Sequence, residues 1–153
     1  MENLFELALK WQAENGAAMA TVVETWGSAP RRAGAQMLVS KSGAMQGSVS
    51  GGCVEGAVVL EAMEAVETGQ PRLLEYGVAD DQAFAAGLAC GGTIRILVEP
   101  VAQRIVNFEQ AALMQSNGDA FALETDLSNW DQRFAGVGQH ADLYAADRST
   151  VVD

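Results

Sequence analysis

Hydrophobic residues recur along the chain with two different spacings, and each spacing predicts one kind of secondary structure. Near the N-terminus, Leu4, Leu7, Ala8 and Trp11 follow one another at intervals of one to three residues. These intervals place them on one side of a helix, so we expect an amphipathic helix over residues 3–15. The same pattern predicts two further helices, at residues 53–68 and 101–116.

Runs of β-branched and other apolar residues between turn-forming residues predict strands. Strands are expected at residues 18–26, 36–40, 72–78, 93–100 and 119–127. Glycine and proline punctuate the connections, most clearly in the segment GSAPRRAGA. The tail, residues 128–153, has mixed polarity and no clear period, so we expect a hairpin or an arm that needs a neighbour.

Strands and helices that alternate in this way favour an α/β sandwich, with α+β as the alternative. We expect a mixed β-sheet packed with two or three helices in a single domain. The chain has 153 residues, which is enough for one such domain with its own hydrophobic core.

Composition excludes several classes of protein. Apolar residues make up 49% of the chain and charged residues 19%, which argues against disorder. The uncharged stretches at 42–54 and 82–94 contain glycine and are shorter than the roughly 20 apolar residues of a membrane span. Glu2 and Glu6 stand where a signal peptide would carry lysines. We therefore expect a cytoplasmic protein that contacts no membrane.

The net charge of −11 argues against a nucleic-acid binder, which needs a basic face. The charge is unevenly distributed, however. Residues 25–54 contain no acidic residue but include Arg31, Arg32 and Lys41, so this stretch carries +3. Either the cations cluster by chance, or they form a local pocket for an anion.

The segment GSVSGGCVEGAVV brings Cys53 to the start of an expected helix, directly after Gly51 and Gly52. The positive end of the helix dipole favours a thiolate and lowers the pKa of the thiol. Glycines allow a ligand to approach the backbone N–H groups closely. The pattern therefore indicates an anion-binding site centred on a soft nucleophile or metal ligand. The alternative is a small buried cysteine that packs at a helix start.

Cys90 stands in a similar context, followed by Gly91 and Gly92 and then by a strand. If its loop lies at the same sheet edge as the Cys53 loop, the two thiols could face one site. A buried structural cysteine is equally compatible with the pattern. With only one histidine, the chain lacks the ligand pattern of a structural zinc site.

Ser28, Arg31 and Arg32 lie in the loop after the first expected strand. Arginine holds phosphate in a bidentate fork, so these arginines are candidates for phosphate binding. The alternative is a pair of solvated loop arginines.

Three motifs together, ATVVETWGSAPRRAGAQMLVS, GSVSGGCVEGAVV and ACGGTIRILVEP, resemble the N-terminal domain of the XdhC/CoxI family. Its members are maturation factors for xanthine dehydrogenase and carbon monoxide dehydrogenase. The resemblance covers roughly residues 3–100 in order and spacing. It suggests a domain over residues 1–116, and residues 117–153 are expected to form a strand or arm that packs on this domain or on a dimer partner.

The resemblance implies a protein that transiently binds the molybdenum cofactor, in its molybdopterin or nucleotide form, and passes it to a molybdenum hydroxylase apo-enzyme. It also implies help from a partner cysteine desulfurase. The family's functional cysteine corresponds to Cys53, which would be a ligand of the molybdenum. The segments 28–32 and 90–92 correspond to the other two motifs of the family.

Fuller members of the family carry a second, Rossmann-like domain, and we expect none in this chain. The chain is then either a fragment or a short stand-alone member, and a homodimer is compatible with its apolar composition. Two other functions stay open from the residues alone. One is a thiol-dependent redox or transferase domain that uses Cys53 with Cys90. The other is a non-catalytic interaction module whose glycine loops are only structural.

Overall fold

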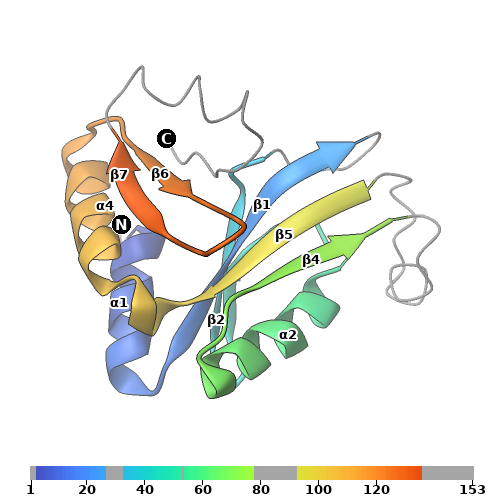
Figure 1. Cartoon of the computed structure of the whole chain (residues 1–153). Coiled ribbons are helices and arrows are strands. Elements are labelled where there is room, and N and C mark those ends of the chain that lie inside the picture. Colours follow the sequence, from blue (N-terminus) through green and yellow to red (C-terminus); the bar gives the residue numbers. More distant parts are fainter. Residues whose placement is uncertain (1–2, 27–32, 53, 78–92, 136–153) are drawn as a thin grey trace.

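A five-stranded sheet with helices on both faces organises the fold (Figure 1). The structure is a computed structural model of the chain. It describes residues 3–26, 33–52, 54–77 and 93–135.

The helices and five of the seven described strands follow one another in the order that the sequence predicts, whereas the strands at 45–47 and 132–135 are additional. The helices are α1 (Leu4–Glu14), α2 (Glu55–Thr68) and α4 (Ile105–Asn117), and a 3₁₀ helix η1 (Val101–Gln103) precedes α4. The strands are β1 (Ala17–Trp26), β2 (Gln36–Ser40), β3 (Met45–Gly47), β4 (Arg72–Tyr76), β5 (Thr93–Pro100), β6 (Ala122–Thr125) and β7 (Gln132–Ala135).

The sheet has the strand order β3-β2-β1-β5-β4, and β6 pairs with β7 as a separate hairpin. The predicted fold class, a sheet packed with helices, is confirmed. The pairing is more uniform than that of a mixed sheet, because every pair of neighbouring strands in the described residues is antiparallel. The central pair, β1 with β5, joins segments far apart in the sequence and runs from Ala18 opposite Pro100 to Trp26 opposite Thr93.

Strand β1 is apolar on both sides because both faces of the sheet are covered. Alternate residues of a strand point to opposite faces. Ala18, Ala20 and Val22 belong to the core under α2, whereas Ala17 and Met19 belong to the core under α1 and α4. Figure 1 shows α2 on one side of the sheet and the other two helices across from it. The apolar run at residues 17–23 of β1, interrupted only by Thr21, therefore reflects its place in the middle layer.

The hairpin packs against the helices through aromatic rings. Phe5 of α1 makes edge-to-face contacts with Phe108 of α4, at 5.0 Å between ring centroids, and with Phe121 just before β6, at 6.0 Å. Phe121 stacks on Phe134 of β7 at 5.2 Å. Such pairs add to the hydrophobic stabilisation that burial of the rings provides. The two helices and the hairpin are thus joined in one aromatic cluster.

The ends of the helices follow local chemistry. Asn3 and Glu6 form a capping box that starts α1. The single helix predicted at 101–116 is instead divided at Arg104, whose backbone φ of −123° is not helical. Leu113 is 63% exposed, because Phe108, Ala111 and Ala112 define the buried face of α4. No helix in the described ranges combines the length and apolar character needed to cross a membrane.

Gly47 and Gly56 offer a test of the backbone around the start of α2. A Cβ at Gly47, where φ is +89°, would lie 2.5 Å from the Gln36 carbonyl oxygen, whereas a Cβ at Gly56 in α2 would meet nothing within 4 Å. We expect Gly47→Ala to lower the free energy of unfolding by about 2 kcal/mol or more. Gly56→Ala should raise it by about 0.5–1 kcal/mol, because alanine favours helix. Urea unfolding followed by circular dichroism measures both, and equal effects would contradict this backbone geometry.

Candidate functional site

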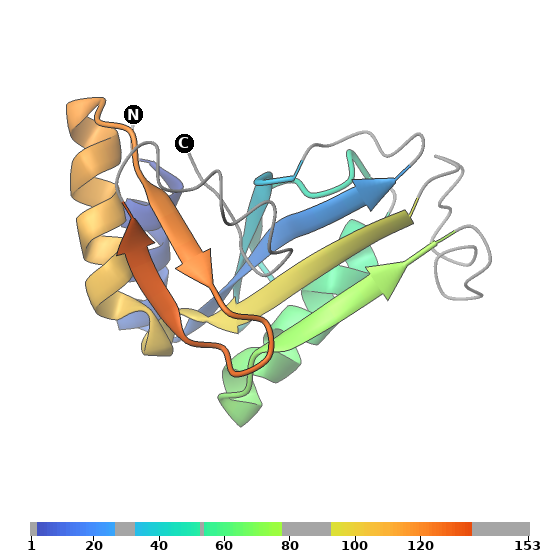
Figure 2. The same cartoon turned by 45° about the horizontal axis from the view of Figure 1, so that its top comes forward.

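One end of the sheet anchors each of the segments in which the sequence analysis found candidate residues. Strand β1 ends at Trp26 opposite Thr93, the first residue of β5, and β4 ends at Tyr76 opposite Ile94. At the same end Gly47 of β3 pairs with Met37 near the start of β2. Figure 2 shows the tips of β1 and β4 and the first turn of α2 on this side of the molecule. The topology therefore attaches the arginine segment, the Cys53 loop and the Cys90 segment to one end of the sheet.

The loop between β3 and α2 is built around the carboxylate of Glu55. Its Oε2 atom accepts hydrogen bonds from the Ser48 hydroxyl at 2.6 Å, the Val49 N–H at 3.1 Å and the Ser50 N–H at 3.0 Å. Its Oε1 atom accepts from the Ser50 hydroxyl and from the Gly52 N–H at 3.0 Å. Donors from three consecutive residues and from Gly52 thus converge on a side chain whose residue is only 6% exposed.

The hydroxyls of Ser48 and Ser50 also accept hydrogen bonds from the backbone. The Ser48 hydroxyl oxygen accepts from the Gly51 N–H at 2.9 Å, and the Ser50 hydroxyl oxygen accepts from the Val54 N–H at 2.9 Å. Each hydroxyl therefore donates to Glu55 and accepts from the backbone. The loop, residues 48–52, is closed on itself by this network, which we call the Glu55 cradle.

Glu55 is held in its charged form. Burial by itself raises the pKa of this carboxyl, but the hydroxyls of Ser48 and Ser50 and the N–H groups of Ser50 and Gly52 lower it from 4.5 to about 2. Hydrogen bonds to an ionised carboxylate favour that form. Glu55 is also the first residue of α2, where a negative charge is stabilised by the helix dipole.

The structure places the predicted glycines and corrects the start of the helix. Gly51 and Gly52 are exposed and have left-handed φ angles of +68° and +109°, which favour glycine. Helix α2 begins at Glu55 with Val54 as its N-cap, not at Cys53, because the Glu55 carboxylate binds the N–H groups of the preceding loop. The remaining predicted site residues lie outside the described residues: Ser28, Arg31, Arg32, Cys53, Cys90 and Gly91.

The engagement of the glycine N–H groups changes the picture of an open anion site. The N–H of Gly52 donates to Glu55 and that of Gly51 donates to Ser48. A phosphate at these groups would have to displace the carboxylate or the hydroxyl, and it would meet the negative charge of Glu55. The internal carboxylate already takes the role that the sequence analysis gave to an external anion.

Sequence reasoning missed Glu55, although the signal was present. Acidic residues are enriched in the first turn of helices, and serine-glycine loops offer hydroxyl and N–H donors. Glu55 stands at that position in GSVSGGCVE. Its burial could not be deduced, because it depends on how β3 and α2 meet.

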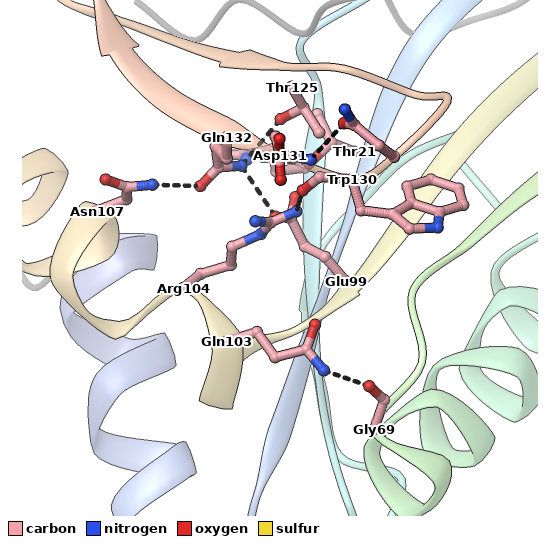
Figure 3. A network of polar contacts seen from close by, with 12 residues as sticks. Thr21, Gly69, Glu99, Gln103, Arg104, Asn107, Thr125, Trp130, Asp131 and Gln132 are labelled. Atoms are coloured by element: carbon pink, nitrogen blue, oxygen red, sulfur yellow. Dashed lines mark hydrogen bonds and ion pairs between the residues drawn. The ribbon is translucent and has the colours of Figure 1, made fainter.

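A second polar network lies at the other end of β5 and is structural (Figure 3). Buried Glu99 accepts from the Arg104 Nε atom at 2.7 Å and from the Gln132 side-chain amide at 3.0 Å. Arg104 also donates to the Trp130 carbonyl oxygen at 2.7 Å. Burial raises the pKa of Glu99, and the charge and hydrogen bond of Arg104 oppose that rise. This network ties β5, α4 and the hairpin together, and each of its charges has a partner in the fold.

Within the described part of the chain, no three side chains among histidine, cysteine, aspartate and glutamate gather as a metal-binding group. The Glu55 cradle is therefore the feature of that part that bears most directly on the candidate site. It stands beside the sequence position of Cys53 and at the end of the sheet where the other two segments begin or end.

Glu55→Gln tests the cradle through its pH dependence. Because the folded pKa is lower than the unfolded one, the carboxylate stabilises the fold fully above pH 4.5 and loses this effect as the pH falls toward 2. We expect the variant to be less stable at pH 7 by about 2–3 kcal/mol, since the glutamine NH₂ group faces donors. Between about pH 6 and 3 the parent should lose about 2 kcal/mol more than the variant.

The measurement is the free energy of unfolding from urea titrations at several pH values. Glu67→Gln is the matched control, because Glu67 is an exposed glutamate in the last turn of the same helix. It should follow the parent at every pH. Parallel pH curves for the parent and Glu55→Gln would contradict the role of the carboxylate.

Comparisons with known proteins show a family and a fold that this chain resembles. The profile described as the XdhC and CoxI family matches residues 10–77. A solved chain of a xanthine dehydrogenase from Bacillus halodurans superimposes with a TM-score of 0.68 and 28% sequence identity, over 84% of this chain and 39% of that one. This neighbour supports the fold described above.

Curated relatives match over shorter stretches. The molybdenum cofactor insertion chaperone PaoD of Escherichia coli is 44% identical over 81 residues, which are 53% of this chain and 25% of PaoD. YqeB of the same organism is 38% identical over 97 residues, 63% of this chain and 18% of YqeB. A Bacillus subtilis protein described as a probable xanthine dehydrogenase subunit is 37% identical over 89 residues, 57% of this chain and 27% of that protein.

The matched regions span about a quarter or less of the length of these curated relatives. Within this chain the family match contains the Glu55 cradle and the arginine segment, whereas Cys90 and Gly91 lie beyond it. The resemblance found in the sequence motifs is confirmed. Residues 10–77, somewhat less than half of the 153 residues, are thus similar to the XdhC and CoxI family.

Proposed function

We propose that this chain binds the molybdenum cofactor as a cargo and delivers it to the apo-enzyme of a molybdenum hydroxylase of the xanthine or carbon monoxide dehydrogenase type. The observation that carries the proposal is the 44% identity with a molybdenum cofactor insertion chaperone, together with the family match over residues 10–77. The glycine-rich loop that contains Cys53 lies inside that match.

Cys53 is the proposed ligand of the molybdenum. A thiolate is a soft ligand and suits a metal that the cofactor already holds through sulfur. Cys53 follows Gly52, which is exposed and where a Cβ would meet nothing within 4 Å. The backbone before the cysteine is therefore open to a bulky guest. A thiolate that must stay free of disulfides fits a reducing compartment, so we propose that the transfer takes place in the cytoplasm.

The phosphate of the cofactor is assigned to Arg31 and Arg32, with Ser28 as an additional donor. The N–H groups of Gly51 and Gly52 are engaged by the Glu55 cradle, which leaves the arginines as the better phosphate ligands. Their segment leaves β1 at Trp26 and rejoins the described residues close to Val22, where the Gly34 N–H donates to the Val22 carbonyl oxygen at 2.7 Å.

Cys90 and Gly91 are proposed to contribute from the segment that leads into β5. This segment ends opposite the last residue of β1, so its anchor lies beside that of the arginine segment. A cysteine desulfurase is the proposed second partner, since sulfuration of the cofactor needs a sulfur donor. A homodimer belongs to the same proposal, in which residues 117–153 extend the domain of residues 1–116 and pack on it or on a dimer partner.

Cys53→Ala tests the metal ligand. After co-expression with the cofactor pathway, we expect the purified variant to hold at least about tenfold less molybdenum and pterin than the parent, because loss of a metal ligand costs more than about 1.4 kcal/mol. Metal analysis and pterin fluorescence give the two amounts, and circular dichroism checks the fold. A Cys53→Ala protein that retains as much cofactor as the parent would refute the assignment. It would return attention to the redox or transferase and interaction-module alternatives.

The double variant Arg31→Ala/Arg32→Ala tests the phosphate contacts. We expect its affinity for the cofactor to fall about tenfold or more at low salt, and the difference from the parent to shrink at about 0.5 M salt. Lys41→Ala is the matched control, because Lys41 is the third cation of the same basic stretch but follows the opposite end of β2. Equal loss in both variants would point to general charge and not to a phosphate site.

A further inference from the structure

Glu55 accepts hydrogen bonds from most residues of the loop that precedes Cys53. The proposed function assigns no role to Glu55. Its carboxylate oxygens accept from Ser48, Val49, Ser50 and Gly52, and the Ser48 hydroxyl extends the network to Gly51. Every one of these bonds joins two groups of the chain itself, so the shape of the loop has an internal cause.

We propose that Glu55 is the positioning residue of the cofactor-binding loop: its carboxylate holds residues 48–52 in the binding shape before the cofactor arrives. This inference rests on the proposed function, because it names the residue that prepares the same site. Glu55 acts through the loop and is not itself proposed to touch the cofactor.

The geometry favours positioning over a general role in stability. A carboxylate that only neutralises the start of a helix would need no hydroxyl donors from two serines. Here the hydroxyls of Ser48 and Ser50 both donate to Glu55. The Ser48 hydroxyl oxygen also accepts from the Gly51 N–H, and the Ser50 hydroxyl oxygen accepts from the Val54 N–H. The residues on both sides of Cys53 in the chain, Gly52 and Val54, are therefore each tied to this network.

The left-handed backbone of Gly51 and Gly52 supports the same inference. A loop with consecutive φ angles of +68° and +109° costs backbone entropy to hold, and glycine loses more of it than any other residue. An internal carboxylate that accepts from Gly52 offsets that cost during folding. The cofactor then meets an ordered loop and loses less free energy on binding.

Binding kinetics distinguish a positioning residue from a direct ligand. If the loop has the binding shape for only a fraction of the time, the observed affinity is reduced in proportion to that fraction. The reduction appears as a lower association rate. We expect Glu55→Gln to bind molybdopterin cofactor, released from a purified molybdoenzyme, with an association rate lower by about tenfold. Its dissociation rate should stay within about twofold of the parent, because the bound loop has the same contacts to the guest.

Two matched variants complete the kinetic test, which stopped-flow pterin fluorescence can follow. Glu67→Gln, on the same helix, should bind with both rates unchanged. Ser48→Ala should slow association less than Glu55→Gln, and it should add little in the Glu55→Gln background, since both changes act on one network. An unchanged association rate in Glu55→Gln, or a change confined to dissociation, would overturn the positioning role.

Amide hydrogen exchange in the cofactor-free protein separates this inference from the proposed function. In Glu55→Gln the N–H groups of Ser50 and Gly52 should exchange at least about tenfold faster, while those of Val58 and the sheet keep their protection. Unchanged exchange would overturn the inference even if the parent binds cofactor. If the parent binds none, the proposed function fails and the positioning role in cofactor binding fails with it, whereas failure of the Glu55 variants alone leaves the function standing.

Discussion

The candidate site depends on one buried carboxylate. Glu55 gathers its hydrogen-bond donors from a loop of serines and glycines, and it does so from the first residue of the helix that this loop precedes. In the absence of that acceptor, several N–H groups near the start of α2 would be buried or half-buried without partners. The loop, the start of the helix and the approach to Cys53 are therefore consequences of the same interaction.

The charge of Glu55 also affects which of the proposed ligands is suited to bind the phosphate. A carboxylate that is charged at neutral pH already uses the positive potential at the start of α2. An anionic guest gains less from that helix end than the bare sequence suggests. The basic segment after β1 then becomes the more natural place for a phosphate, and the fold brings the anchor of that segment to the same end of the sheet. Charge of opposite sign on neighbouring segments can orient a large guest without a deep pocket.

Much of the fold was accessible from the sequence because its elements have strong local patterns. The period of apolar residues predicts α1 and the body of α2, and β2 lies where it was expected. The outward position of Leu113 and the break at Arg104 were not predicted. Both depend on long-range contacts, such as that of Arg104 with Trp130 in the hairpin. The sequence predicts Gly51 and Gly52 as site residues but does not predict Glu55. The spacing of apolar residues along the chain does not indicate where a charged side chain is buried.

The buried pair of Glu99 and Arg104 has a consequence for where the chain can be shortened. Gln132 and the Trp130 carbonyl oxygen complete the bonds of this pair. Phe121 packs on the Phe5 ring of α1, and Phe134 stacks on Phe121. A truncated protein that stops after α4 would keep all five strands of the large sheet. It would lose the hydrogen bonds that Gln132 and Trp130 supply to the Glu99–Arg104 ion pair, and it would expose the aromatic rings that the hairpin covers. The smallest autonomous folding unit of this polypeptide therefore extends through β7, even though the residues of the candidate site lie far upstream.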